Sequence, residues 1–232
     1  MKTTCRMTLL ALLSLAPLAA QAVPAEIILL RHGEKINPFQ LSRIGEERAQ
    51  ALAQVYLGKH ASHSILPKGV QPAALMTVTL HTIETMTPTA LSWGLPETAY
   101  TAVPEYFQSE KQKKAQETQR TQEAAAALLH DPQYDGKVVV VMWEHARIAS
   151  AKLERQFPGQ QVTFRQLLHL GKLAGVPKTW PKHTFDYFWI VKYQGNNPVP
   201  VSFHLVKQSY TGKFANLPQN AWGQPEYGTE PR

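Results

Sequence analysis

Residues 25–35 read Ala-Glu-Ile-Ile-Leu-Leu-Arg-His-Gly-Glu-Lys, an apolar run that ends abruptly in a charged cluster. A continuous run of large aliphatic residues predicts a strand buried on both faces, as in a parallel sheet covered by helices. Residues 137–142 (Lys-Val-Val-Val-Val-Met) repeat this pattern and are followed by Trp143-Glu144-His145. Two predicted strands therefore each lead into a histidine that has charged neighbours.

The rest of the chain alternates between strand and helix patterns. Further strands are predicted over 73–80, 100–103, 185–193 and 201–206, and helices over 41–57, 83–93 (broken near Pro88), 109–129 and 146–156. This alternation predicts a three-layer α/β sandwich with a largely parallel central sheet. Ligands of such open sheets bind beyond the carboxyl ends of the strands, where both histidines are expected.

Local signals refine this outline at two places. Ser42 is a candidate N-cap residue for the first predicted helix, and Gly45 inside that helix lowers its propensity, so we expect Gly45 to mark a close contact. The last twenty or so residues are rich in Pro, Gly and Asn, and we expect them to form an extended tail.

The first 22 residues have the pattern of a secretory signal peptide. Lys2 and Arg6 precede an apolar run over 7–20, and Ala20-Gln21-Ala22 offers small residues for cleavage. The run is shorter than the roughly 20 residues of a membrane span, although a retained anchor is the alternative. We expect cleavage after Ala22, a periplasmic or secreted protein, and a single domain over 23–232 that ends in the tail.

Composition narrows the classes of partner. The chain of 232 residues has a net charge of +7, 44% hydrophobic residues and one cysteine, Cys5, which lies in the leader. A disulfide scaffold and a collagen or disordered chain are excluded. Positive charge favours an anionic partner. Because no nucleic-acid motif is visible, we expect a small molecule rather than a nucleic acid, and no membrane span after cleavage. The oligomeric state stays open.

Two histidines and an arginine at one sheet edge suit phosphoryl transfer. A neutral imidazole is a competent nucleophile, and the planar fork of an arginine matches the oxygens of the phosphoryl group. A nearby carboxylic acid can protonate the leaving oxygen. This chemistry requires no metal and no cofactor. The other histidines, including the pair His60 and His63 in a loop-like stretch, are not expected to form a metal site.

Arg31-His32-Gly33 resembles the RHG signature of the histidine phosphatase superfamily, which includes cofactor-dependent phosphoglycerate mutases and histidine acid phosphatases. The resemblance extends over roughly residues 25–210 and includes the pattern Leu41-Ser42, Gly45, Ala49 and Leu52 in the following helix. It implies a phosphoglycerate mutase-like fold and a phosphomonoesterase that acts on a small phosphate ester through a phosphohistidine. Mutase activity is less expected for an exported chain.

The resemblance also implies roles for particular residues. His32 would be the phosphorylated nucleophile, Arg31 would bind phosphate, and His145 would be the second histidine of the pocket. The general acid is open: Glu105 is preferred, with Glu144 and then Glu34 as alternatives. Glu144 is also a candidate for contact with the substrate. Substrate specificity is expected from residues 104–120 and from the loop at 60–72.

One position departs from the family pattern. Thr77 to Thr85 aligns with the segment that usually carries a second phosphate-binding arginine, and His81 occupies the position of that arginine. An imidazole is largely uncharged near neutral pH unless a phosphate raises its pKa. Lys35 is a second possible source of positive charge. The alternative function is therefore a catalytically weak or inactive protein that binds a phosphate ligand.

Overall fold

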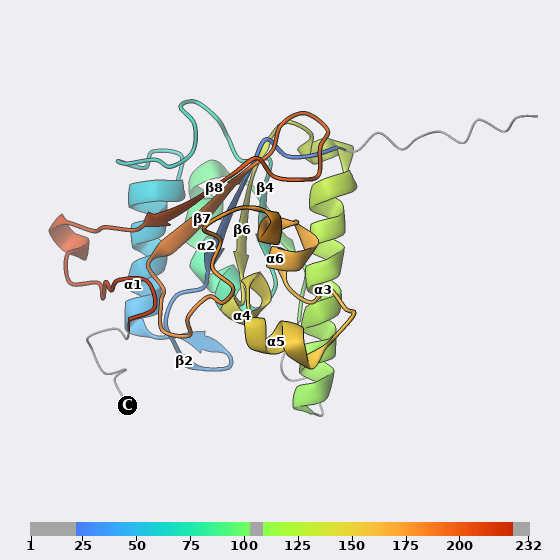
Figure 1. The fold of residues 1–232 in the computed structure, drawn as a ribbon. Coiled ribbons are helices and arrows are strands. Elements are labelled where there is room, and N and C mark those ends of the chain that lie inside the picture. The colour runs from blue at the N-terminus through green and yellow to red at the C-terminus, as the bar shows by residue number, and fades with distance from the viewer. Residues whose placement is uncertain (1–21, 103–108, 225–232) are drawn as a thin grey trace, which may run out of the picture.

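The computed structural model describes residues 22–102 and 109–224 (Figure 1). Six strands form one central sheet in the order β5-β4-β6-β1-β7-β8, and a separate hairpin pairs β2 with β3. The strands are β1 (Glu26–Arg31), β2 (Lys35–Asn37), β3 (Gln40–Leu41), β4 (Ala74–Thr77), β5 (Glu97–Ala99), β6 (Val138–Trp143), β7 (Tyr187–Lys192) and β8 (Ser202–Lys207).

The four strands β5, β4, β6 and β1 run parallel, whereas β7 and β8 form an antiparallel hairpin at the edge next to β1. Every residue of β1 and of β6 is buried, as their apolar runs predict. The predicted three-layer sandwich with a largely parallel sheet is therefore confirmed. The hairpin between β7 and β8 turns through Gly195, whose positive φ of 55° suits a residue without a side chain.

Helices cover both faces of the sheet (Figure 1). They are α1 (Arg43–Ala51), the π-helical turn η1 (Leu52–Leu57), α2 (Leu80–Trp93), α3 (Glu110–His130), α4 (His145–Ile148), α5 (Ala151–Gln156) and α6 (Phe164–Leu167), with short 3-10 turns η3 (Pro132–Tyr134), η4 (Leu170–Lys172) and η5 (Gly212–Phe214).

Alternate residues of the central strands divide the core into two layers. Ile27 and Leu29 of β1 pack in the layer that holds α3, α4 and α6, while Ile28 and Leu30 pack in the layer that holds α1, η1 and α2. This division follows from the period of two residues along a strand. It explains why β1 is apolar at every position from Ile27 to Leu30.

Helix α2 continues through Pro88, although the sequence predicted a break there. Proline removes one hydrogen bond from the helix, to the carbonyl four residues earlier. Met86 and Ala90 are buried in the core on either side of it, and this packing keeps the helix continuous. The short strand predicted at 100–103 lies earlier in the chain, as β5.

The single helix predicted over 146–156 is instead two helices, α4 and α5, with a break at Ala149 and Ser150. The break has a structural partner, because Ser150 forms a β-bridge with Thr179 and the carbonyl of Ala149 accepts from the Trp180 N–H at 3.0 Å. This pairing ties residues 179–180 to the end of α4. It brings the following Pro181 and Lys182 towards the end of β1.

The C-terminal segment is not an extended tail over the part that the structure describes. Phe214, Leu217 and Asn220 are buried, and the Trp222 ring lies 5.2 Å from that of Trp180 and 5.1 Å from that of Tyr187. Aromatic and aliphatic side chains in a Pro- and Gly-rich segment thus anchor it on the core. The predicted signal peptide falls almost wholly on residues 1–21, outside the described residues.

Candidate functional site

The site lies where β1 and β6 end side by side. The two strands are parallel and in register, so that Arg31 pairs with Trp143. Strands in this relation end at the same edge of the sheet. His32 therefore follows β1 directly beside the point where Glu144 and His145 follow β6, and the predicted meeting of the two histidine segments is seen in the structure.

The orientation of His32 leaves one ring nitrogen available. Its side chain is 1% exposed, and its Nδ1 lies 2.5 Å from the carbonyl oxygen of Gly33. A carbonyl only accepts, so Nδ1 carries a proton, and in the neutral form of the ring the lone pair is on Nε2. Nε2 faces Glu144, whose Oε2 lies 3.3 Å away. The ring is thus prepared as a nucleophile through Nε2.

The segment from 181 to 185 holds Arg31 beside His32. The guanidinium carbon of Arg31 lies 3.6 Å from the centre of the Phe185 ring, a cation–π arrangement. Its Nη1 donates to the carbonyls of Pro181, at 3.5 Å, and Lys182. The same Phe185 ring meets His32 edge-on at 6.2 Å. Arg31 is a buried cation with a fixed direction.

His145 begins α4, and its Nδ1 is buried without a hydrogen-bond partner among the described residues. Burial and the positive charge of Arg31 lower the pKa of His145 to about 3. The ring is therefore neutral at pH 7. A neutral imidazole with an unoccupied nitrogen can donate to, or accept from, a ligand that binds beside it.

His81 lies in the first turn of α2 and is 2% exposed. Its ring centre is 5.4 Å from that of His32, and its Nε2 lies 2.8 Å from the carbonyl oxygen of Asn37 in the β2–β3 hairpin. Its Nδ1, like that of His145, has no partner within the described part of the chain. Burial, Lys35 and His32 lower the pKa of His81 to about 4, so this ring is also neutral.

Glu144 supplies a carboxylate at the centre of the site. The hydroxyl of Thr79 donates to its Oε1 at 2.9 Å, while its Oε2 faces His32. Burial opposes its charge, but the interaction with the His32 ring and the charge of Lys35 hold the pKa of this carboxyl well below its usual range. Lys35 is exposed at the start of β2 and acts on the site through its charge.

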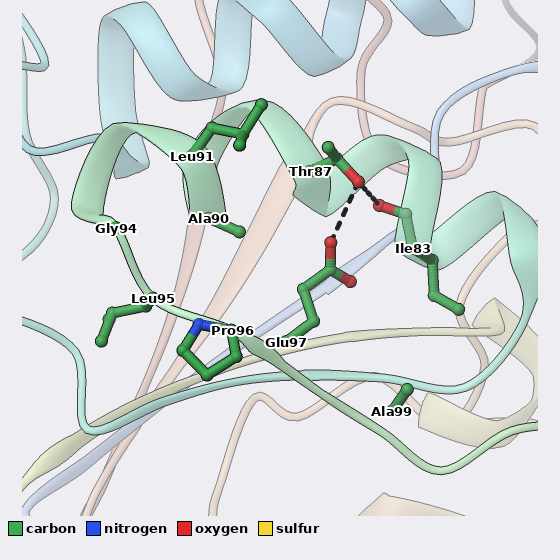
Figure 2. A pocket seen from close by; sticks show the side chains of 9 residues that line it. All are labelled: Ile83, Thr87, Ala90, Leu91, Gly94, Leu95, Pro96, Glu97 and Ala99. Atoms are coloured by element: carbon green, nitrogen blue, oxygen red, sulfur yellow. Dashed lines mark hydrogen bonds between the residues drawn. The ribbon is translucent and has the colours of Figure 1, made fainter.

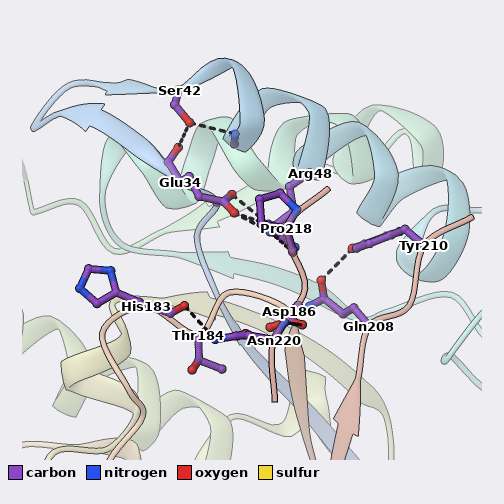
Figure 3. Close-up of polar contacts among 12 residues, drawn as sticks. Glu34, Ser42, Arg48, His183, Thr184, Asp186, Gln208, Tyr210, Pro218 and Asn220 are labelled. Atoms are coloured by element: carbon purple, nitrogen blue, oxygen red, sulfur yellow. Dashed lines mark hydrogen bonds and ion pairs between the residues drawn. The ribbon is translucent and has the colours of Figure 1, made fainter. Parts of the chain in front are cut away.

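Glu34 lies in a buried ion pair with Arg48 (Figure 3). Both of its carboxylate oxygens accept from Arg48, whose Nη2 also donates to the carbonyl of Pro218 at 2.9 Å. Burial opposes the charge of Glu34, and Arg48 more than offsets this, so its pKa is lowered. This pairing with Arg48 makes Glu34 the least suited of the candidate general acids, and its role stays a prediction. Glu105, the preferred acid, lies outside the described residues.

Gly45 confirms the predicted close contact. A Cβ atom there would lie 2.0 Å from the carbonyl oxygen of Glu34, and one on Gly33 would lie 2.9 Å from the Gly45 backbone. The side chain of Ser42 accepts from the Gly45 N–H at 3.2 Å, as expected of an N-cap. Two facing glycines let the loop after β1 rest directly on α1.

Sequence analysis missed three supporting residues. Thr85 accepts from the Gly33 N–H at 3.0 Å and donates to the carbonyl of His81 at 2.7 Å, and so joins the two histidine segments. The Thr79 hydroxyl donates to Glu144 and orients it, and the Phe185 ring packs against the guanidinium of Arg31. The threonines stood in a segment already aligned with the family pattern, but their partners are distant in sequence and only the fold identifies them.

The loop at 60–72 does not cover this site. It leads into the start of β4, at the opposite end of the sheet from His32, and the Ala73 N–H donates to the Val138 carbonyl at the beginning of β6 (Figure 1). Helix α3 does approach the site: Lys114, Glu117 and Thr118 all contact Arg147 on α4. The specificity prediction for the helical part of 104–120 stays a prediction, and residues 104–108 lie outside the described residues.

A separate pocket of about 470 Å³ opens between the end of α2 and β5, and its lining includes no histidine (Figure 2). Its lining is mainly apolar, and Glu97 accepts from the Thr87 hydroxyl within it at 3.0 Å. Burial raises the pKa of Glu97. The pocket is lined by Ile83, Thr87, Ala90, Leu91, Gly94, Leu95, Pro96, Glu97 and Ala99.

No set of three or more His, Asp or Glu side chains within 22–102 and 109–224 is arranged to hold a metal ion. In the same part of the chain no helix combines the length and the apolar character that crossing a membrane requires.

No protein-family model matches the sequence, and neither does any curated protein. Among solved structures the chain is similar to a candidate phosphohistidine phosphatase, SixA from Agrobacterium tumefaciens, with 15% identity, a TM-score of 0.38 and coverage of 82% of this chain and 99% of that one. A mycobacterial glucosyl-3-phosphoglycerate phosphatase gives 15% identity and a TM-score of 0.40 over 79% and 98% of the two chains.

A third structure, described as mycobacterial hydrolase 2, gives 15% identity and a TM-score of 0.42 over 85% of this chain and 96% of that one. The protein thus resembles the histidine phosphatase superfamily in its sequence motif, and the solved structures to which it is similar are described as phosphatases and a hydrolase.

Proposed function

We propose that the protein is a phosphatase that hydrolyses phosphomonoesters through a phosphohistidine on His32. One observation carries the proposal: Nδ1 of His32 is occupied by the Gly33 carbonyl, which leaves Nε2, beside Glu144, as the nitrogen that can attack phosphorus in the neutral ring. A buried imidazole fixed in this tautomer is suited to attack phosphorus. The RHG motif at the end of a buried strand supports the same assignment.

The groups around Nε2 suit a phosphoryl ligand. Arg31 provides a buried positive charge, and its direction is set before any ligand binds. His145 has a buried Nδ1 without a partner among the described residues, and it can donate to a phosphate oxygen in the tautomer that carries the proton there. Nδ1 of His81 also lacks a partner in this part of the chain, but the His81 proton lies on Nε2, so Nδ1 can donate only once the ring is protonated. Stabilisation of the charge that develops on these oxygens is the largest expected contribution to catalysis.

A protein that binds a phosphate ligand and turns it over little or not at all is the second candidate. The neutral state of His81 favours it, because a low pKa deprives the pocket of a charge that an arginine would supply permanently. This candidate predicts binding of phosphate without a phosphoenzyme.

Phosphoenzyme trapping separates the two candidates. The purified protein is mixed with an aryl phosphate, quenched, and analysed for a phosphoryl group that is labile to acid and stable to base. The proposal expects this group on His32 together with release of the phenol. His32→Ala should lose both, whereas His130→Ala, a change at the exposed end of α3, should keep both. Binding of phosphate without either signal would favour the second candidate.

The compartment is a further proposal: the leader is removed after Ala22 and the mature protein is periplasmic or secreted. The pattern of residues 1–22 supports it. Expression of the full chain in a Gram-negative host, followed by fractionation and mass measurement, tests it. A soluble periplasmic product that begins at Val23 is expected, and a product that retains the leader would contradict it.

A further inference from the structure

We propose that Glu144 is the proton carrier of this site: it takes up a proton when a phosphate group binds and passes that proton to the leaving oxygen. This inference rests on the proposed phosphohistidine chemistry and deepens it. It assigns the acid role to a residue that directly precedes the second histidine and touches the attacking nitrogen.

The position of Glu144 carries the inference. Its Oε2 lies 3.3 Å from Nε2 of His32, the atom that would bond to phosphorus. The Thr79 hydroxyl holds Oε1 at 2.9 Å, and the Thr79 N–H in turn donates to the Thr82 hydroxyl at 2.8 Å. The start of α2 thus holds the carboxylate beside the attacking nitrogen.

The charged and titratable groups near Glu144 come from four elements. His32 and Lys35 approach from the segment that follows β1, His81 from α2, Glu117 from α3, and His145 and Arg147 from α4. Arg147 donates to Glu117 at 3.2 Å, to Thr118 at 2.8 Å and to the Lys114 carbonyl at 2.6 Å. Its charge is committed to α3.

A phosphate group next to Nε2 places its negative oxygens against the Glu144 carboxylate. Two like charges in a partly buried site disfavour each other, and the usual relief is protonation of one of them. The carboxylate is ionised in the empty site, so a bound dianion raises its pKa from a low starting value. Uptake of one proton then offsets the positive charge that is missing at His81.

With Glu144 in this role, the protons of both reaction steps balance. In the first step Nε2 of His32 bonds to phosphorus, the bond to the leaving oxygen breaks with its electron pair on that oxygen, and Glu144 gives this oxygen its proton. In the second step water bonds to phosphorus and gives a proton to Glu144, while the P–N bond breaks and its electron pair returns to Nε2. Release of phosphate frees the proton.

Proton uptake is measured directly by titration calorimetry with inorganic phosphate at pH 8, in two buffers of different ionisation enthalpy. The native protein should take up about one proton per phosphate bound. Glu144→Gln should take up close to none and should bind phosphate more tightly at this pH. Glu84→Gln, which removes an exposed carboxylate on α2, should behave like the native protein.

His81 is the competing acceptor of the proton, and its variant decides between the two. If Glu144 is the carrier, His81→Asn keeps the uptake of one proton and Glu144→Gln loses it. Uptake that disappears in His81→Asn and remains in Glu144→Gln would overturn the inference. Binding without any uptake in the native protein would overturn it as well.

Turnover measurements test whether Glu144 gives its proton to the leaving oxygen. Glu144→Gln should lower kcat by about 10²- to 10⁴-fold on an alkyl phosphate, which needs a protonated leaving group. The loss should be far smaller on a nitrophenyl phosphate, whose leaving group departs as an anion. Equal losses on both substrates would refute the acid role.

Failure of the inference is distinguishable from failure of the proposed function. Native activity with a phosphoryl group on His32, combined with an unchanged Glu144→Gln variant, refutes the carrier alone. A native protein that neither hydrolyses phosphate esters nor forms a phosphoenzyme refutes the function, and the calorimetric test of proton uptake still applies to it.

Discussion

The rings of His32 and His81 lie 5.4 Å apart, and Nε2 of His81 contacts the Asn37 carbonyl while its Nδ1 is buried without a partner among the described residues. A neutral ring thus occupies the place next to the nucleophile where the family pattern has an arginine. This relationship makes the charge at position 81 the most informative variable of the site.

His81→Arg should therefore strengthen phosphate binding and raise the rate. A permanent guanidinium next to His32 adds charge-assisted hydrogen bonds to phosphate, and we expect phosphate affinity and kcat/KM to rise by about 10- to 100-fold. Steady-state kinetics on an aryl phosphate and inhibition by inorganic phosphate measure both. His81→Asn serves as the control, because it keeps a short polar side chain without a charge. An unchanged or lower rate in His81→Arg would mean that the present ring has a specific task.

The stability of the empty protein should depend on pH through its buried histidines. The pKa values of His81 and His145 are lowered from 6.5 to about 4 and about 3. The unfolded chain then binds more protons than the folded one below pH 6.5, so stability falls as the pH falls through this range and is level above it. Urea denaturation between pH 4 and pH 8 measures the slope.

Replacement of both rings is the corresponding control. The double variant His81→Asn and His145→Asn removes these two titrations, so its stability should vary less between pH 6.5 and pH 4 than that of the native protein. Equal slopes in the two proteins would place the acid sensitivity elsewhere.

Gly45→Ala should destabilise the protein because the added Cβ meets the Glu34 carbonyl oxygen at 2.0 Å. Backbone atoms must move apart, and we expect a loss of about 3 kcal/mol of unfolding free energy. Chemical denaturation provides the measurement. Gly171→Ala is the matched control: its Cβ would meet only the end of the Arg165 side chain, at 3.0 Å, and that side chain can move. Similar losses in both variants would contradict the close-contact argument.

Arg48→Met should lower the free energy of unfolding by about 3–5 kcal/mol, because it leaves the Glu34 carboxylate buried without its partner. The pair also anchors the C-terminal segment through the Pro218 carbonyl (Figure 3). The double variant Glu34→Gln and Arg48→Met removes the stranded charge and should recover part of the loss. Denaturation midpoints of the three proteins test this, and a double variant as unstable as Arg48→Met would contradict it.

Sequence alone predicted most of the sheet. The apolar runs before Arg31 and before Trp143 identified β1 and β6, since only strands buried on both faces tolerate so many aliphatic residues in succession. Ser42 and Gly45 were also identified correctly, because capping and close packing act through one or two residues. The break at Ala149 was missed, because its cause is a bridge to a segment near Thr179 that is distant in the chain.

The residue types determined which chemistry is possible. His32 follows Arg31 at the end of one strand, and Glu144 and His145 follow the end of another. His81 stands where the family pattern has an arginine. Tertiary structure decided which of them act together. The parallel register of β1 and β6 places Glu144 next to His32. Arg48 on α1 instead holds Glu34 in an ion pair. Residue type sets what a side chain can do, but its charge state and its partners depend on burial and on distant segments. These are settled only when the chain folds.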